Sequence, residues 1–359
     1  MNQAVIFLQN RAHRAGAQTC LARLMHFMHG KGERVALLCS ENGWLTEECG
    51  RKGIPFIVQQ FPKSRSLLSR ILGNAAFGRR AAHAMLQAGI SPRIIHANDH
   101  TEGLLGLALS RALNARSAVF LRSSAMSERD YYKYGCNRYG LVIAVGDELQ
   151  QRAQGWDPEN RIGLIYDGID ESEFLPAKPK PLATPARALV IGNAGEAKGW
   201  GDLAGAIKTL EAKGLALPAF DFTGDPSGQS YQDTLKGVRS ECGFLDRRDD
   251  FRALVREYDL VINPSRNESF GMAAIEVLAA GVPLISSRTG VIEQVLTNPD
   301  ILFEPRNPDA LARTLEHGLS RWSSIDFGVE AAQRSIRNKF LTNHVWNRLQ
   351  PMYHRLVRR

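Results

Sequence analysis

The chain has 359 residues, of which 44% are hydrophobic and 23% are charged, and its formal net charge at pH 7 is +8. This length exceeds one typical hydrophobic core and predicts two domains of about 170 to 180 residues each. The composition is that of an ordinary globular protein, which excludes a disordered or fibrous chain, and no apolar run approaches the length of a membrane-spanning helix.

Short apolar runs alternate with helical stretches through the first half of the chain. The run Ala4–Leu8 comes first, and a loop to Gly16 and a helix ending at Gly30 follow it. The later runs that we predict as strands are Val35–Leu38, Ile54–Val58, Ile94–His96, Ala118–Leu121 and Leu141–Val145. Strands that alternate with helices predict an α/β fold with a doubly wound parallel sheet. His96 and Asp99 then lie at the carboxyl end of a strand, where such sheets bind ligands, although capping of the next helix is an alternative role for Asp99.

The positive charge is unevenly distributed along the sequence. The segment from Lys52 to Asn98 contains no acidic residue, and neither does the tail after Glu330. Within the first of these segments, apolar and basic residues are interspersed: Leu67, Leu68, Ile71, Leu72 and Phe77 with Lys63, Arg65, Arg70, Arg79 and Arg80. This arrangement is typical of an amphipathic segment, and we expect segment 51–93 to contact an anionic membrane surface. The alternative is a solvated basic face above buried leucines.

The cysteines and histidines show no pattern of metal or disulfide chemistry. The five cysteines (Cys20, Cys39, Cys49, Cys136 and Cys242) are scattered without a Cys-x-x-Cys pair, and the nine histidines show no ligand spacing. We therefore expect reduced thiols in a cytoplasmic protein, with no metal site and no cofactor. The start of the chain also lacks the charged region and long apolar core of a signal peptide.

A proline-rich segment divides the chain. Its four prolines are Pro176, Pro179, Pro181 and Pro185. Because this run fits neither a helix nor a strand, we predict a linker at 176–186 between an N-terminal domain at 1–175 and a C-terminal domain at 187–339. The closing segment from Arg334 to Arg359 is predicted to be helical, with a break at Pro351.

The second domain is predicted to begin with the strand Ala188–Gly192, whose following loop contains Lys198. The most informative stretch comes later. Leu260–Ile262 is typical of a buried parallel strand, and a helix at Ser269–Ala280 is predicted to end at Gly281, where a left-handed residue fits.

A strand that leads into a helix leaves the free amides of the helix start at the carboxyl edge of the sheet. These amides and the positive end of the helix dipole together favour an anion such as a phosphate. Glu268 and Glu276 flank this helix start in the sequence. The sequence therefore predicts that each carboxylate binds one set of hydroxyls of a nucleotide-sugar, on either side of its diphosphate.

The complete string around these glutamates resembles a known family. Pro-Ser-x-x-Glu-Ser-Phe-Gly-x-x-x-x-Glu, closed by Ala-Ala-Gly-x-Pro, is similar to the donor site of retaining GT-B glycosyltransferases of family four, including their Glu-x7-Glu signature. The resemblance covers nearly the whole chain and is more specific in the second half. It implies a GT-B fold: two Rossmann-like domains that face a cleft, with a final helix at about 340–359 that packs back on the first domain.

The resemblance also implies roles for individual residues. The implied catalytic residues are Glu268, which holds the donor sugar, and Lys198, which neutralises the diphosphate; Glu276 holds the ribose. The other donor-binding positions that it implies are Gly16, Asn193, Thr223, Gly224, Leu245, Ser269, Phe270, Gly271 and Met272. The acceptor-side candidates are His96, Asp99 and Arg122.

Several positions depart from the family pattern: Gly16 is the only glycine of a usual Gly-Gly pair, Val291 replaces a second glycine, and three further residues differ. Asn193 occupies the place of an arginine that generally binds the diphosphate, and this loss should weaken diphosphate binding by about 1 to 3 kcal/mol. Arg122 occupies the place of a histidine at the reaction centre, so that a cation is expected to face the sugar or a phosphorylated acceptor. Asp167 replaces the usual asparagine before Gly168, and both residue types suit a turn.

We therefore expect a retaining, metal-independent hexosyltransferase that uses a nucleoside diphosphate sugar. The expected acceptor is a glycan or glycolipid, such as a lipopolysaccharide or lipid-linked cell-envelope glycan, on the inner face of the cytoplasmic membrane. A sugar-nucleotide epimerase on the same fold is the alternative, and it would need acid and base groups around the sugar. A basic nucleic-acid-binding protein is a weaker alternative, because the sequence shows neither stacking platforms nor a recognition motif, and we expect no nucleic acid partner.

Overall fold

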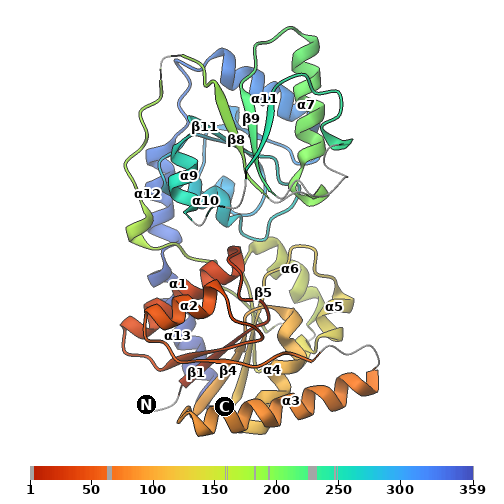
Figure 1. Ribbon diagram of the computed structural model, residues 1–359, viewed down its shortest axis with the longest axis vertical. Coiled ribbons are helices and arrows are strands. Elements are labelled where there is room, and N and C mark those ends of the chain that lie inside the picture. Colours follow the sequence, from red (N-terminus) through yellow and green to blue (C-terminus); the bar gives the residue numbers. More distant parts are fainter. Residues whose placement is uncertain are drawn as a thin grey trace. The chain divides into compact units, whose positions relative to one another are not determined.

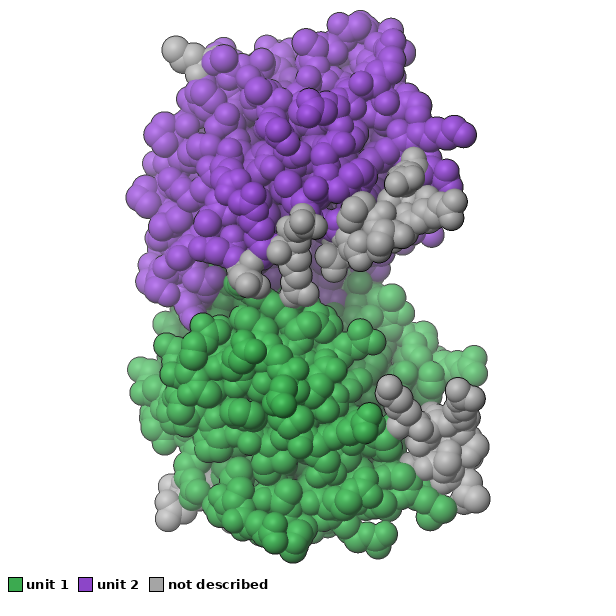
Figure 2. Space-filling model, viewed as in Figure 1, with its two compact units in different colours: residues 1–169, 340–359 green, residues 170–339 purple. Residues whose placement is uncertain are grey.

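The structure is a computed structural model of the chain. It describes residues 4–62, 67–157, 159, 161–181, 183–192, 195–224, 233–245, 248 and 250–358, with the backbone alone for residues 67–71. The chain divides into two compact units, which are coloured separately in Figure 2: residues 1–169 with 340–359 form unit 1, and residues 170–339 form unit 2. Each unit is an α/β structure with its own sheet (Figure 1).

Unit 1 is built on a seven-stranded parallel sheet with the strand order β3-β2-β1-β4-β5-β6-β7. The strands are β1 (Ala4–Gln9), β2 (Val35–Cys39), β3 (Phe56–Val58), β4 (Pro92–Ala97), β5 (Arg116–Leu121), β6 (Leu141–Ala144) and β7 (Ile162–Leu164). The order of the strands reverses between β1 and β4. Open parallel sheets bind ligands at such a reversal, beside the carboxyl ends of the strands.

Helices cover both faces of this sheet. They are α1 (Gly16–Gly30), α2 (Trp44–Arg51), α3 (Leu67–Gln87), α4 (Gly103–Leu113), α5 (Glu128–Lys133), α6 (Asp147–Trp156) and α13 (Thr342–Arg358). Successive side chains of β1 point to opposite faces, as expected for a strand. Phe7 therefore joins a core with α1 and α13, whereas Leu8 joins a second core with α3 and α4.

Unit 2 contains a six-stranded parallel sheet with the order β10-β9-β8-β11-β12-β13. The strands are β8 (Arg187–Val190), β9 (Ala219–Thr223), β10 (Cys242–Leu245), β11 (Leu260–Asn263), β12 (Leu284–Ser287) and β13 (Leu302–Phe303). Its helices include α7 (Trp200–Ala212), α9 (Phe251–Arg256), α10 (Met272–Ala279), α11 (Pro308–Ser320) and α12 (Val329–Lys339). The order reverses between β8 and β11, so the loops after these two strands meet at one edge of the sheet.

Two predicted helix boundaries need correction. Helix α10 begins at Met272 instead of Ser269, because Gly271 precedes it with a left-handed φ of 93°. Its end agrees with the prediction, since Gly281 follows with a φ of 80°. Pro351 lies inside α13 and does not break it. Pro351 has no N–H group to donate to the carbonyl of Asn347, four residues earlier. Asn347 and Pro351 are both exposed, so water can form a hydrogen bond with that carbonyl instead.

The chain passes from unit 1 to unit 2 between Ile169 and Asp170 and returns at Phe340, so the final helix belongs to unit 1, as the resemblance implies. The described residues of the segment predicted as a linker, 176–186, pack on the rest of unit 2. Lys178 Nζ donates to the carbonyl of Tyr258 at 2.9 Å, and Trp322 Nε1 donates to the carbonyl of Pro181 at 2.9 Å. In the part of the chain that the structure describes, no helix is both long enough and apolar enough to span a bilayer.

Candidate functional site

Lys198 and Glu268 lie in direct contact in unit 2. They come from the loops after β8 and β11, are 70 residues apart in the sequence, and approach to 2.5 Å between Lys198 Nζ and Glu268 Oε1. Their side chains are 33% and 20% exposed, so both remain accessible to a ligand. The stem of Lys198 lies over Gly192, where an added Cβ would come within 3.2 Å of the lysine carbons. The two residues predicted to be catalytic are therefore brought together at the reversal of the sheet.

A second ion-pair network holds the two loops against each other. Arg266 binds Asp202 through two hydrogen bonds of 2.7 Å each and Glu196 through one of 2.8 Å. The hydrogen bonds to Asp202 raise the pKa of Arg266. Gly199 approaches Pro264 so closely that a Cβ there would lie 1.8 Å from the proline carbonyl oxygen. These contacts explain how a loop that contains Gly192, Gly195 and Gly199 still fixes the position of Lys198.

The start of α10 is shaped by two glycines. Gly271 caps the helix in the left-handed region, and Gly290 allows its backbone to lie against Phe270, since a Cβ at position 290 would be 2.2 Å from the Phe270 carbonyl oxygen. Phe270 is buried, whereas Ser269 and Met272 are half-buried. The half-buried Glu276 lies in the second turn. A helix start presents unpaired amides and a positive dipole end, which suits the predicted diphosphate.

The remaining predicted donor positions differ in their hydrogen bonds and in their place on the sheet. The Thr223 hydroxyl accepts a hydrogen bond from the Gly192 amide at 3.1 Å and donates to the Val190 carbonyl at 3.2 Å. It therefore fastens the ends of β8 and β9 and acts as a positioning residue. Gly224 follows β9 and Leu245 ends β10, and both are half-buried. Asn193 lies outside the described residues.

In unit 1, Arg122 forms a buried ion pair with Asp167. Its NH1 group donates to both carboxylate oxygens, at 2.5 and 2.7 Å, and its Nε group donates to the Asn98 carbonyl at 2.9 Å. The two charged side chains are only 7% and 12% exposed. Burial acts to lower the pKa of Arg122, but the charge and hydrogen bonds of Asp167, together with the other nearby acidic groups, outweigh burial and raise the pKa. The expectation of a cation that faces a ligand is therefore corrected: the guanidinium of Arg122 lies against the Asp167 carboxylate.

The acceptor-side prediction for His96 is wrong, because its side chain is 0% exposed. The ring lies between Phe7 and Phe120, with centroid distances of 5.2 and 4.2 Å, and its Nδ1 atom is hydrogen-bonded to the Tyr353 hydroxyl. Burial, followed by the charge of Arg122, lowers the pKa of His96 well below its usual value. His96 is a neutral core residue that joins β4 to α13.

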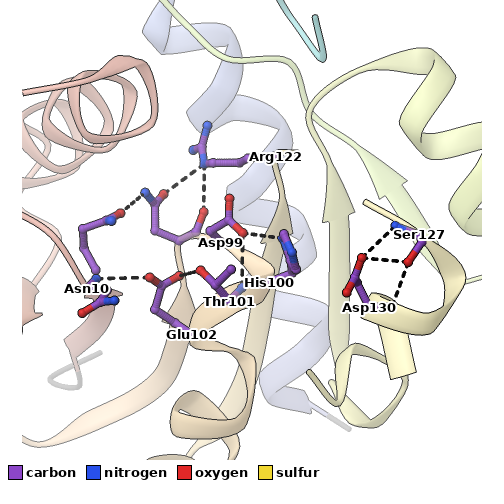
Figure 3. Close-up of polar contacts among 10 residues, drawn as sticks. Asn10, Asp99, His100, Thr101, Glu102, Arg122, Ser127 and Asp130 are labelled. Atoms are coloured by element: carbon purple, nitrogen blue, oxygen red, sulfur yellow. Dashed lines mark hydrogen bonds and ion pairs between the residues drawn. The ribbon is translucent and has the colours of Figure 1, made fainter. Parts of the chain in front are cut away.

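Asp99 caps the turn that precedes α4, as the alternative reading of the sequence held. Its carboxylate accepts the Thr101 amide at 3.2 Å and also contacts the ring of His100 (Figure 3). Its side chain remains 22% exposed at the carboxyl edge of the sheet. Capping is confirmed, and contact with an acceptor stays a prediction for this residue.

Glu102 is a buried carboxyl group that sequence reasoning missed. It is 3% exposed, and its carboxyl oxygens accept hydrogen bonds from the Asn10 amide and the Thr101 hydroxyl, both at 3.2 Å (Figure 3). Burial, and then the nearby charge of Asp99, raise the pKa of Glu102 to about 8. The group therefore ties the loop after β1 to the turn before α4. The only sequence signal is an acidic residue directly before an apolar helix.

Gly16 begins α1, next to the loop after β1. It is exposed, and a Cβ added there would meet no described atom within 4 Å. Within unit 1, a side chain at this position is therefore sterically allowed, and the donor role of Gly16 stays a prediction. Among the described residues, no cluster of three histidine, cysteine or carboxylate side chains suited to a metal ion is present.

Comparisons with known proteins agree with this architecture. Residues 14–173 match the family model described as Glycosyltransferase Family 4, and residues 185–321 match the model described as Glycosyl transferases group 1. The uncharacterized glycosyltransferase MJ1607 of Methanocaldococcus jannaschii is 28% identical over 225 residues, or 57% of each chain. The D-inositol 3-phosphate glycosyltransferase of Corynebacterium urealyticum is 26% identical over 304 residues, or 72% of each chain. The first of these matches thus spans less than two thirds of the relative's length.

Two solved structures show the same fold over almost the entire chain. Anabaena Alr3699/HepE in complex with UDP-glucose aligns with a TM-score of 0.80 at 18% identity, covering 98% of this chain and 99% of that one. The apo form of the lipopolysaccharide outer core galactosyltransferase WaaB aligns with a TM-score of 0.70 at 15% identity, covering 98% and 99%. The fold is thus GT-B, with two Rossmann-like units. The two family models that match the chain, at residues 14–173 and 185–321, both describe glycosyltransferases.

Proposed function

We propose that the protein is a retaining glycosyltransferase that transfers a sugar from a nucleoside diphosphate sugar to an acceptor. The observation that carries the proposal is the contact of Lys198 with Glu268 beside the glycine-capped start of α10. A cation, helix amides and a carboxylate are the groups needed to bind a diphosphate and the sugar attached to it. The complex of Anabaena Alr3699/HepE with UDP-glucose supports a donor of this class.

The mechanism that we propose relies on positioning and electrostatics. A bound donor supplies new partners to both residues: its diphosphate pairs with Lys198, and its sugar hydroxyls donate to Glu268. The bond between the anomeric carbon and the phosphate oxygen then breaks while Lys198 and the amides of α10 stabilise the charge on the departing diphosphate. The acceptor hydroxyl attacks from the same face, and its proton passes to the leaving phosphate oxygen. Retention of configuration follows from this geometry.

The proposed acceptor is a lipopolysaccharide or another lipid-linked cell-envelope glycan, reached from the inner face of the cytoplasmic membrane. Helix α3 supports this part of the proposal, because it is amphipathic. Phe77 is buried in the core of unit 1, which corrects its assignment to the membrane face, whereas Leu72 is 62% exposed and Arg79 and Arg80 are exposed. Lys63 and Arg65 lie outside the described residues, as do the side chains of Leu67, Leu68, Arg70 and Ile71.

A panel of nucleotide-sugars tests the donor site. We expect one of them to raise the melting temperature of the wild-type protein, because a selective ligand stabilises the native state by mass action. Glu276→Ala should weaken binding of that donor and of the free nucleoside diphosphate alike, because the ribose contact exists before and after the reaction. Isothermal titration of both ligands measures the effect. A variant that loses donor affinity but binds the nucleoside diphosphate as the wild type does would place Glu276 on the sugar instead.

Removal of divalent cations tests the role of Lys198. If Lys198 and the amides of α10 neutralise the leaving diphosphate, chelator should leave the transfer rate unchanged. The measurement is the initial rate in EDTA and after magnesium or manganese is added back. A rate that falls in chelator and recovers with either metal would contradict metal independence.

A further inference from the structure

Unit 1 carries a basic groove that is lined by residues of α3, of α4 and of the segment from α5 to Arg138. Side chains from α3, α4 and the segment from α5 to the 3-10 turn Cys136–Arg138 enclose a space of about 770 Å³. We call it the α3–α4 groove, and it is lined by Asn74, Ala75, Arg79, Leu104, Leu107, Ala108, Arg111, Ala112, Tyr132, Lys133, Asn137 and Arg138. None of the residues of the catalytic proposal belongs to it.

The packing of α3 on α4 forms this groove (Figure 1). The two helices are in close contact at Gly78, where an added Cβ would lie 2.8 Å from the carbonyl oxygen of Ala108. This close contact fixes the next residue, Arg79, beside α4. Leu72, Ala75 and Arg79 follow one another at helical spacing and share one face of α3. An exposed leucine thus lies on the same helix face as a groove cation.

The groove combines four cations with an apolar lining. Arg79, Arg111, Lys133 and Arg138 are all exposed, and none of them forms an ion pair with a residue in the described part of the chain. No acidic residue is among the described lining residues. Four cations that have no ion-pair partner among the described residues repel one another around this space, and a bound anion relieves the repulsion. Tyr132, 46% exposed, and Leu72, 62% exposed, add apolar surface that water does not favour.

We propose that the α3–α4 groove binds the headgroup of an anionic phospholipid at a membrane surface. The four cations pair with the headgroup phosphate and with neighbouring anionic lipids, while Leu72 and Tyr132 contact the boundary with the acyl chains. This inference rests on the proposed function, because an enzyme that glycosylates a lipid-anchored acceptor must work at the membrane surface. Its test does not require turnover.

The groove makes a specific prediction for binding to vesicles. One lysine or arginine near an anionic surface changes the membrane partition coefficient by about fivefold. The variant Arg79→Gln/Arg111→Gln/Arg138→Gln removes three groove cations and should therefore lower that coefficient at least about tenfold. The measurement is sedimentation of the full chain with phosphatidylcholine vesicles, with and without phosphatidylglycerol, at low and at higher salt. We expect wild-type binding only with phosphatidylglycerol, and less of it at higher salt. Leu72→Gln should weaken the binding that remains at higher salt.

The matched control removes three exposed cations of unit 1 that lie outside segment 51–93 and do not line the groove: Arg116→Gln/Arg348→Gln/Arg355→Gln. If the control loses as much binding as the groove variant, general charge explains the effect and the groove proposal is wrong. If the protein binds free glycerol phosphate but no vesicles, the groove is a site for a small phosphorylated molecule and the lipid assignment is wrong. Binding of an acidic protein but not of vesicles would also overturn it.

The same samples separate this proposal from the proposed function. Thermal shift with UDP-glucose and the other nucleotide-sugars reports on unit 2, and we expect the groove variant to respond as the wild type does. A groove variant that loses vesicle binding and retains the donor response supports both proposals. A wild type that binds vesicles but responds to no nucleotide-sugar would contradict the function and leave the groove in place.

Discussion

Asp167→Ala is expected to destabilise unit 1 by about 3 to 5 kcal/mol, because it leaves the buried charge of Arg122 without its partner. The guanidinium side chain is only 7% exposed, so water cannot replace the lost carboxylate. Hydrogen exchange measured by mass spectrometry provides the readout. Amides of β5 and β6 should exchange faster in the variant, while amides of β11 in unit 2 serve as an internal reference.

Two further variants test this explanation. Arg122→Met/Asp167→Leu removes both charges and should recover most of the lost stability, since a buried ion pair can be replaced by apolar groups at little net cost. Glu48→Ala breaks the more exposed pair with Arg51 and should change stability by less than about 1 kcal/mol. If Asp167→Ala is no more destabilising than Glu48→Ala, the ion pair of Arg122 is not important for stability.

Glu268→Gln is expected to lower turnover at least about tenfold, which corresponds to roughly 1.4 kcal/mol of barrier, while nucleotide binding remains nearly intact. The reason is that the neutral amide no longer accepts strong hydrogen bonds from the donor sugar and no longer pairs with Lys198. The steady-state rate and nucleoside diphosphate affinity measure the two parts of this prediction. Because Lys198 and Glu268 are in contact, the combined variant with Lys198→Gln should lose less than the sum of the two single losses.

Glu316→Gln is the matched control for Glu268. Glu316 lies on α11, pairs with Lys213 at 2.5 Å, and its side chain is 37% exposed. Its removal should change turnover little. Near-normal turnover of Glu268→Gln would overturn the role of that carboxylate. Mass spectrometry of the products distinguishes transfer from the alternative activity: a donor that is converted without any acceptor would favour a sugar-nucleotide epimerase.

Strands and helix ends could be predicted from the sequence where a short run of neighbouring residues carries the signal. Runs such as Ala4–Leu8 and Val35–Leu38 became β1 and β2, and Gly281 ends α10 as predicted. Short strands were missed for a physical reason. β7 has three residues with a glycine in the middle, and β13 has two residues, so neither presents a run long enough to indicate burial.

The candidate site was predictable in unit 2, where the residues themselves carry the chemistry. Lys198 and Glu268 were singled out separately, and the reversal of strand order between β8 and β11 brings them together. The sequence could not show that Arg122 pairs with Asp167, because β5 and β7 are not neighbours in the sheet and the two residues are 45 positions apart. His96 was misread for a related reason: its partner Tyr353 is 257 residues away.

The return of the chain to unit 1 has a consequence for the order in which the protein folds during synthesis. The core on one face of the unit 1 sheet includes Trp346, Leu349, Tyr353 and Leu356 from α13, which leave the ribosome after all of unit 2. The part of that face that α13 covers therefore stays exposed while the intervening 170 residues are made and fold, whereas α1 and α2 can already pack on the rest. A nascent chain in this state exposes an apolar sheet surface, and we expect it to depend on chaperones until its last helix docks.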